Sequence, residues 1–287
     1  MPTNTYAVDH YENFPVASIL LPRKMRRPIA IVYRFARSAD DFADEGDLTP
    51  DARLALLQAY RDALQALERG EIPVQGLFHD LHKEVIQPFG IPISLFQDLL
   101  DAFSQDVVKT RYADFGEVVQ YCRRSANPIG RIVLHLAGHD SAKNLAWSDG
   151  ICTALQLINF WQDIAIDWQK DRVYLPQDEM TRFGVTEQQI AAGTVDEKWR
   201  ALLAFQVDRT WRMLRAGSPL GIALPGRLGI EIRLTVLGGD AILNRLKQSG
   251  YDPFKHRPVL SKWDWPVLLF QSLSRKPRKQ QLSACSH

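Results

Sequence analysis

Apolar and polar residues recur along this chain with the period of an α-helix almost throughout. Leu, Ile, Val, Phe and Ala return at spacings of three and four, and no long window alternates strictly between apolar and polar positions. The fold class that we expect is therefore all-α. The pattern predicts helices over residues 28–45, 50–69, 76–88, 92–105, 114–137, 141–168, 186–192, 196–217, 219–247 and 262–272.

Several of these predicted helices carry start and stop signals. Thr49-Pro50-Asp51 supplies an N-cap, a proline at the first helical position and an acid in the first turn. Gly70, Gly90 and Gly250 are each soon followed by a proline, which is typical of helix ends. Because no Pro/Gly/Ser-rich linker divides the chain, we expect one domain over residues 1–274.

Composition narrows the class of protein. The 287 residues are 46% hydrophobic, which is enough for a large core, and 35 basic against 33 acidic residues leave a net charge of only +2. The nearly equal numbers of basic and acidic residues argue against a nucleic-acid partner. Three cysteines without a CxxC pair, and an N-terminus without a signal-peptide pattern, favour a reducing, cytoplasmic location.

The last residues differ from the rest of the chain. Residues 275–287 carry four basic side chains and little that could pack, so we interpret them as a disordered tail. An electrostatic anchor on an anionic membrane is the alternative, which leaves open peripheral contact with the inner membrane.

The first candidate site is an acidic pair in the predicted helix 28–45. Asp40 and Asp44 stand one turn apart on one face, and Tyr33 and Arg37 precede them on nearly the same face. Two such carboxylates repel each other unless a cation lies between them, and magnesium prefers oxygen ligands. Arg37 could bind a phosphate on the same ion. The alternative is a solvated acidic helix face.

A second polar stripe lies in the predicted helix 141–168. Gln156, Asn159, Asp163 and Asp167 form one seam on a helix that is otherwise apolar around most of its circumference. A buried helix should not carry such a seam unless its members have partners. We therefore favour a metal or diphosphate site over a hydrogen-bonded core seam, and expect the two acidic pairs to face each other.

The chain resembles the squalene and phytoene synthase family in four stretches. They are HYENFPVASILLP at 10–22, YRFARSADDFAD at 33–44, RYADFGEVVQYCRRSANPIG at 111–130 and ALQLINFWQDIAIDWQKDRVYLP at 154–176. The likeness extends from about residue 10 to about residue 251.

The resemblance implies a single-domain isoprenoid-synthase helical bundle with a central apolar cavity. It implies that magnesium is held by Asp40, Asp44, Asn159, Asp163 and Asp167. Diphosphate contacts would come from Arg37, Arg172, Tyr174 and Asn13, and the cavity would be lined by Phe14, Tyr33, Tyr121 and Gln156.

Departures from the family pattern bear on the product. Ile166 and Lys170 stand where many members have an acid and Asn, and Ser125-Ala126-Asn127-Pro128 replaces a glycine-rich run. The stretches at 121–131 and 160–176 resemble bacterial hopanoid-associated hydroxysqualene synthases. That branch implies presqualene diphosphate as substrate, water capture of its cation, no NADPH, and an upstream presqualene diphosphate synthase.

Candidates for holding the water are Asn127 and Gln162, with Ser125 behind them, although Asn127 could equally shape a helix kink.

Other functions fit less well. Condensation of two farnesyl diphosphates to presqualene diphosphate or squalene is the rival within the family. A di-iron bundle needs Glu-x-x-His repeats, which are absent from the sequence. A non-catalytic interaction bundle leaves the polar seam at Asp163 unexplained.

Overall fold

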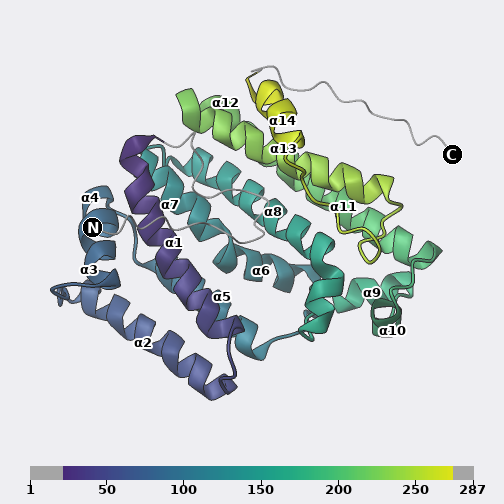
Figure 1. Ribbon diagram of the computed structural model, residues 1–287, viewed down its shortest axis with the longest axis horizontal. Helices are drawn as coiled ribbons and strands as arrows, with labels where there is room; N and C mark the ends of the chain where they lie inside the picture. The colour runs from purple at the N-terminus through teal and green to yellow at the C-terminus, as the bar shows by residue number, and fades with distance from the viewer. Residues whose placement is uncertain (1–21, 274–287) are drawn as a thin grey trace.

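The computed structural model describes residues 22–273, which form helices joined by turns. Within this range there is no strand, only an isolated parallel bridge between Arg111 and Val173. The predicted all-α class is thus confirmed. The helices, labelled in Figure 1, are α1 (Arg23–Asp44), α2 (Pro50–Glu68), α3 (Leu77–Leu81), the π-helix η1 (His82–Ile86), α4 (Gln87–Phe89), α5 (Ser94–Val108), α6 (Phe115–Ser125), α7 (Asn127–Ala137), α8 (Ala142–Gln169), α9 (Gln177–Phe183), α10 (Glu187–Ala192), α11 (Glu197–Gly217), α12 (Leu220–Ala223), α13 (Gly226–Gln248) and α14 (Asp264–Ser272).

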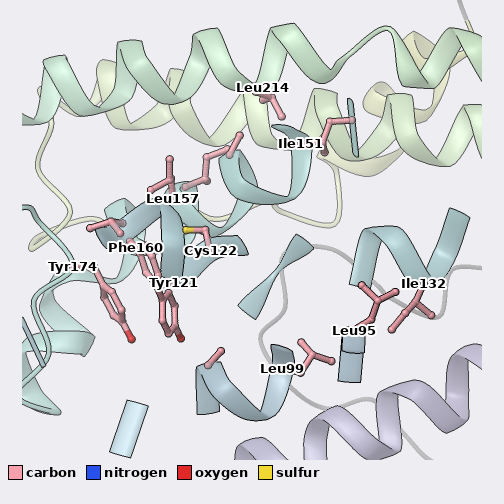
Figure 2. Close-up of a cluster of buried hydrophobic side chains, with 14 of the residues drawn as sticks. Leu95, Leu99, Tyr121, Cys122, Ile132, Ile151, Leu157, Phe160, Tyr174 and Leu214 are labelled. Carbon is pink, nitrogen blue, oxygen red and sulfur yellow. The ribbon is translucent and has the colours of Figure 1, made fainter. Parts of the chain in front are cut away.

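Helix α8 lies between the other helices, as Figure 1 shows. It packs against α6 and α7 on one side and against α11 and α13 on the other. Its Leu157 and Phe160 belong to a buried cluster with Tyr121 of α6 and Leu214 of α11 (Figure 2). This burial explains why α8 is apolar around most of its circumference.

The remaining helices form two groups around α8. Helices α1, α2 and α5 pack on one another on the α7 side, whereas α13 packs on both α11 and α14 on the other side. One continuous hydrophobic cluster runs from Met25 to Leu246 through both groups. No helix in residues 22–273 is long and apolar enough to cross a membrane.

Prolines account for most of the helix boundaries that we predicted wrongly. The predicted helix 114–137 breaks into α6 and α7 at Ala126, because Pro128 has no N–H and is placed in the first turn of a new helix. Pro225 divides 219–247 into α12 and α13 in the same way. Pro28, which we took as a helix start, is instead buried inside α1, which begins at Arg23.

Two further differences concern short elements. The predicted helix 76–88 contains the π-helical turn η1 and is therefore not one regular helix. Helix α9 was not predicted; its first turn, Gln177-Asp178-Glu179, is polar and shows no apolar repeat. The domain boundary at residue 274 and the tail at 275–287 lie outside the described residues and stay predictions.

Candidate active site

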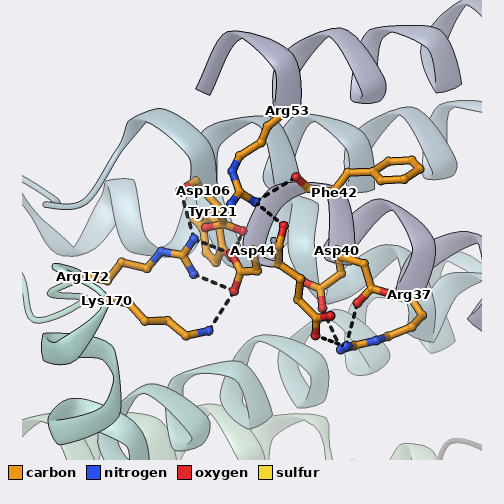
Figure 3. A network of polar contacts seen from close by, with 11 residues as sticks. Arg37, Asp40, Phe42, Asp44, Arg53, Asp106, Tyr121, Lys170 and Arg172 are labelled. Atoms are coloured by element: carbon orange, nitrogen blue, oxygen red, sulfur yellow. Dashed lines mark hydrogen bonds and ion pairs between the residues drawn. The ribbon is translucent and has the colours of Figure 1, made fainter. Parts of the chain in front are cut away.

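The first acidic pair lies at the C-terminal end of α1. Asp40 and Asp44 are both half-buried there. Arg53 of α2 fixes this helix end, as Figure 3 shows, because its guanidinium donates to the carbonyls of Phe42, Glu45 and Gly46 at 2.6–3.1 Å. These carbonyls would otherwise lack partners at a helix terminus. The bonds hold the last turn of α1, and with it Asp44, in place.

Arg37 lies against the acidic pair, as its spacing predicted. Its Nη1 is 3.2 Å from Asp40 Oδ2, and its Nη2 is 2.6 Å from both Asp41 Oδ1 and Glu45 Oε1. Three carboxylates of the same helix end therefore share one guanidinium.

The second acidic pair lies near the C-terminal end of α8. Asn159 Nδ2 donates to Asp163 Oδ2 over 2.8 Å, so these two seam residues contact each other. Arg257, from the segment between α13 and α14, forms a two-pronged ion pair with Asp163. Gln156 is half-buried one turn earlier on the same seam.

The turn after α8 directs a second arginine back toward α1. Asp171 ends the helix in the left-handed region, at a φ of 56°, and Arg111 holds its carboxylate at 2.8 Å. The Arg172 amide then donates to the Asp167 carbonyl, and the Val173 amide to that of Thr110. These backbone bonds fix the direction in which the Arg172 side chain leaves the turn.

Arg172 and Lys170 connect the two acidic helix ends. Arg172 donates to both oxygens of Asp44, at 2.5 and 3.1 Å, and Lys170 Nζ lies 3.0 Å from Asp44 Oδ2 (Figure 3). Acidic pairs that are 123 residues apart in sequence are thereby brought to adjacent helix ends. Outward-facing carboxylates on opposite sides of the molecule would have excluded a shared site, and they are not observed.

The carboxylates of this site differ in charge state. Burial raises the pKa of Asp40 to about 6 and that of Asp167 to about 7, and in each case the other aspartate of the same pair adds to the rise. Burial also acts to raise the pKa of Asp44, but Arg172 and Lys170 outweigh it and lower the pKa below its usual value. Asp40 and Asp167 therefore lack sufficient cationic compensation.

The donor set fits magnesium. Carboxylate and amide oxygens are the ligands that this ion prefers, and it needs only one or two carboxylates when phosphate oxygens and water complete its shell. Within residues 22–273, no three His, Cys, Asp or Glu side chains already form a metal site. The raised pKa values of Asp40 and Asp167 nevertheless indicate an excess of negative charge that a divalent ion would neutralise.

Asp106 of α5 is a half-buried acid beside this network that the sequence did not lead us to select. Its Oδ2 accepts a 2.8 Å hydrogen bond from the Tyr121 hydroxyl, while its Oδ1 is enclosed and has no hydrogen-bond partner among residues 22–273. Burial raises the pKa of Asp106 to about 7, against the opposing effect of Arg172. Asp106 lies seven residues after the buried Leu99 and so on the same helix face, a signal that could have identified it.

Aromatic rings adjoin these acids. Tyr174 stacks on Phe160 with ring centroids 3.7 Å apart, and Tyr112 and Tyr121 lie within 6 Å of Tyr174. Figure 2 shows Tyr121, Phe160 and Tyr174 side by side. Asp167, Arg172, Phe160 and Tyr174 also line a small pocket of about 10 Å³. The polar helix ends thus border an aromatic wall.

The three candidates for holding a water have different hydrogen-bond environments. Asn127 is buried and accepts a 3.0 Å hydrogen bond from Thr153, so it joins α7 to α8 at the helix break. Gln162 is buried and its amide donates to the Pro258 carbonyl, and its role in holding a water stays a prediction. Ser125 Oγ is enclosed and has no hydrogen-bond partner in the part of the chain that the structure describes.

The other predicted residues can be placed only in part. Tyr33 is half-buried on α1, about two turns before Asp40. Asn13 and Phe14 lie outside the described residues, so their predicted contacts stay predictions. Besides Asp106, sequence reasoning missed Arg257 and Arg111, which lie outside the helices that carry the acids and show no sequence signal.

Comparisons with known proteins agree with this geometry. The family profile described as Squalene/phytoene synthase matches residues 7–264. A hydroxysqualene synthase from Sinorhizobium fredii is 34% identical over 259 residues, covering 89% of this chain and 85% of that protein. A phytoene synthase from Mycobacterium tuberculosis is also 34% identical, over 69% of this chain and 65% of its own length.

Solved structures give the same result. The crystal structure of squalene synthase HpnC from Alicyclobacillus acidocaldarius superposes with a TM-score of 0.78 and 35% identity, covering 85% of this chain and 91% of that one. A dehydrosqualene synthase at 21% identity has the same fold, with a TM-score of 0.77. The chain therefore belongs to the squalene/phytoene synthase family, whose members act on prenyl diphosphates.

Proposed function

We propose that this protein is a hydroxysqualene synthase, which converts presqualene diphosphate and water into hydroxysqualene and free diphosphate. The observation that carries the proposal is the contact between the acidic ends of α1 and α8, next to a buried aromatic wall. Relatives named hydroxysqualene synthase at 34% identity support this choice of product.

The helix ends would bind the diphosphate. Asp40, Asp44, Asn159, Asp163 and Asp167 would hold magnesium, which supplies positive charge to the leaving group. Arg172 and Arg37 carry planar guanidinium groups that pair with phosphate as well as with carboxylate. As substrate binds, Arg172 exchanges Asp44 for the diphosphate, and the bond from carbon to the diphosphate oxygen breaks with both electrons on the oxygen.

The aromatic wall would protect the cation that remains. The faces of Tyr121, Tyr174 and Phe160 carry negative potential, which stabilises a nearby positive charge, and their bulk excludes bulk water. The cyclopropyl cation opens, the oxygen of one water forms a bond to the carbon, and that water loses a proton. The Tyr121 hydroxyl with Asp106 behind it is our candidate acceptor. No hydride is consumed, so NADPH is not required.

The substrate identifies the chemistry upstream. A separate enzyme that condenses two farnesyl diphosphates would have to supply presqualene diphosphate. We place both enzymes in the cytoplasm, with peripheral contact at the inner membrane.

Product analysis tests the proposal. Purified protein is given presqualene diphosphate or farnesyl diphosphate, each with Mg²⁺ and with or without NADPH, in ¹⁸O-labelled water. We expect labelled hydroxysqualene from presqualene diphosphate alone. Turnover of farnesyl diphosphate alone would favour the condensing activity that the phytoene synthase relative and the squalene synthase structure suggest.

The same assay locates the capturing water. Ser125→Ala should lower the yield of hydroxysqualene relative to hydrocarbon products, because Ser125 Oγ has hydrogen-bonding capacity to spare. Asn127→Ala is the comparison. If Asn127→Ala leaves the product mixture unchanged, Asn127 serves only to join α7 to α8.

A further inference from the structure

The outward face of α14 is apolar. Trp263, Val267, Phe270 and Leu273 are 78%, 54%, 79% and 57% exposed and recur at the spacing of one helix face. The opposite face packs against α13 and buries Leu268 and Ser272. A surface helix normally presents polar residues to solvent, so this arrangement indicates that something covers the outer face.

Helix α12, beside the last turn of α14, carries a further exposed apolar residue. Arg233 donates to the carbonyls of Ser272 and Gly221, which places the last turn of α14 next to α12. Ile222 of α12 is 46% exposed there. We call Ile222, Trp263, Val267, Phe270 and Leu273 the α14 surface.

The sequence from residue 255 onward, which includes α14, is almost entirely positive in charge. Lys255 and Lys262 are exposed in the segment that precedes α14, and four basic residues follow it in sequence at 275–279. Asp264 is the only acid from residue 255 onward, and Arg245 holds it at 2.5 Å. The partner of this surface should therefore be both apolar and anionic.

We infer that the α14 surface docks on an anionic lipid membrane. Exposed Trp and Phe side chains favour the boundary between headgroups and acyl chains. Each Lys or Arg near an anionic leaflet strengthens binding by about fivefold. A second copy of this chain fits less well, because pairing two α14 surfaces would bring their basic residues together.

Docking there would hold the active site at the membrane. Arg257, which pairs with Asp163, lies six residues before Trp263 in one continuous segment. The aliphatic product could then pass into the bilayer without crossing water. This role of the docking rests on the proposed function, whereas the docking itself is inferred from the exposed and basic residues.

Vesicle flotation with the full-length protein tests the inference. Vesicles of phosphatidylcholine with one quarter phosphatidylglycerol are compared with pure phosphatidylcholine, and no prenyl substrate is present. We expect the protein to float with the anionic vesicles, and the bound fraction to fall as salt is raised. No binding to anionic vesicles would overturn the inference, whatever reaction the enzyme catalyses.

Two substitutions locate the contact. Phe270→Glu should lower the affinity for anionic vesicles at least tenfold, because it places a carboxylate in the apolar face. Val74→Glu is the matched control, since Val74 is 92% exposed, lies outside the α14 surface and gains the same charge. It should bind within twofold of the unchanged protein.

Thermal unfolding and size-exclusion chromatography complete the test. Unfolding temperatures within a few degrees of one another would show that both variants fold. Equal vesicle binding by Phe270→Glu and the unchanged protein would overturn the inference. So would a dimer in solution that Phe270→Glu converts to a monomer, because a second copy would then cover this surface.

Discussion

Glu179 of α9 and the acids at the ends of α1 and α8 are all shielded from solvent, but they are compensated differently. Both oxygens of Glu179 accept hydrogen bonds from Arg209, at 2.7 and 2.8 Å, and Gln206 adds a third at 2.6 Å. Arg209 in turn lies over the ring of Phe115. This acid is neutralised by fixed neighbours of its own.

At the site, carboxylates outnumber the fixed cations that reach them. Asp44 forms ion pairs with both Lys170 and Arg172. Burial and the neighbouring negative charges raise the pKa values of Asp40 and Asp167. Shielded acids therefore serve two purposes in this protein. Glu179 holds helices together, whereas Asp40 and Asp167 keep negative charge available for an incoming cation.

Removing the charge of Asp44 should have the largest effect on activity. Asp44→Asn removes a proposed magnesium ligand, and we expect kcat/KM to fall by roughly 10³. Steady-state kinetics with presqualene diphosphate measures the change. Asp208→Asn, in an exposed ion pair with Arg212, is the matched control and should stay within about twofold. Equal activities of the two variants would place the site elsewhere.

Removing the carboxylate of Glu179 should act on stability instead. Glu179→Ala leaves the half-buried Arg209 without its carboxylate partner, which costs about 3 kcal/mol of unfolding free energy. Urea unfolding measures this loss. Glu71→Ala, in an exposed pair with Arg69, is the control and should leave the urea midpoint nearly unchanged. If Glu179→Ala unfolds like the unchanged protein, the distinction between the two kinds of acid fails.

Asp106 lies between these cases, and its substitution should give an intermediate effect. Asp106→Asn keeps an acceptor for the Tyr121 hydroxyl but cannot take up a proton, so we expect kcat to fall about 10² with KM nearly unchanged. A pH profile of kcat is the diagnostic measurement. If Asp106→Asn changes neither kcat nor its pH profile, Asp106 is excluded as the proton acceptor.

The smallest expected effect is on the pH dependence of stability. The folded pKa values of Asp40 and Asp167, about 6 and 7, lie above the unfolded value of about 4. The stability that these groups contribute is therefore fully present below pH 4 and lost as the pH rises through 7. Mg²⁺ with diphosphate should then raise the unfolding temperature by a few degrees at pH 8 and by less at pH 5.

Scanning calorimetry in EDTA and in Mg²⁺ with diphosphate would measure that difference. In Asp167→Asn the difference between pH 5 and pH 8 should shrink, because one titrating carboxylate is gone. An equal rise at both pH values in the unchanged protein would contradict the assignment of these acids as cation ligands.

Local periodicity explains what could be predicted of the site. Asp40 and Asp44, and Asn159 with Asp163, are close in sequence, so the 3.6-residue period alone places each set on one helix face. The structure finds each set on one helix, and Arg37 against Asp40, as expected. The contact of Gln162 with Pro258 could not be predicted in this way, because its partner lies 96 residues later in the sequence.

By itself, the sequence determined that this protein is helical, which residues form each acidic stripe and, through resemblance, which family it belongs to. Only the tertiary structure decided that Arg172 and Lys170 would reach Asp44, that Arg257 would reach Asp163, and that Asp106 would stand behind Tyr121. The physical reason is range. A helix fixes neighbours within a turn or two, whereas contacts between distant segments depend on how the apolar faces of α1, α5, α6 and α8 pack into a single core.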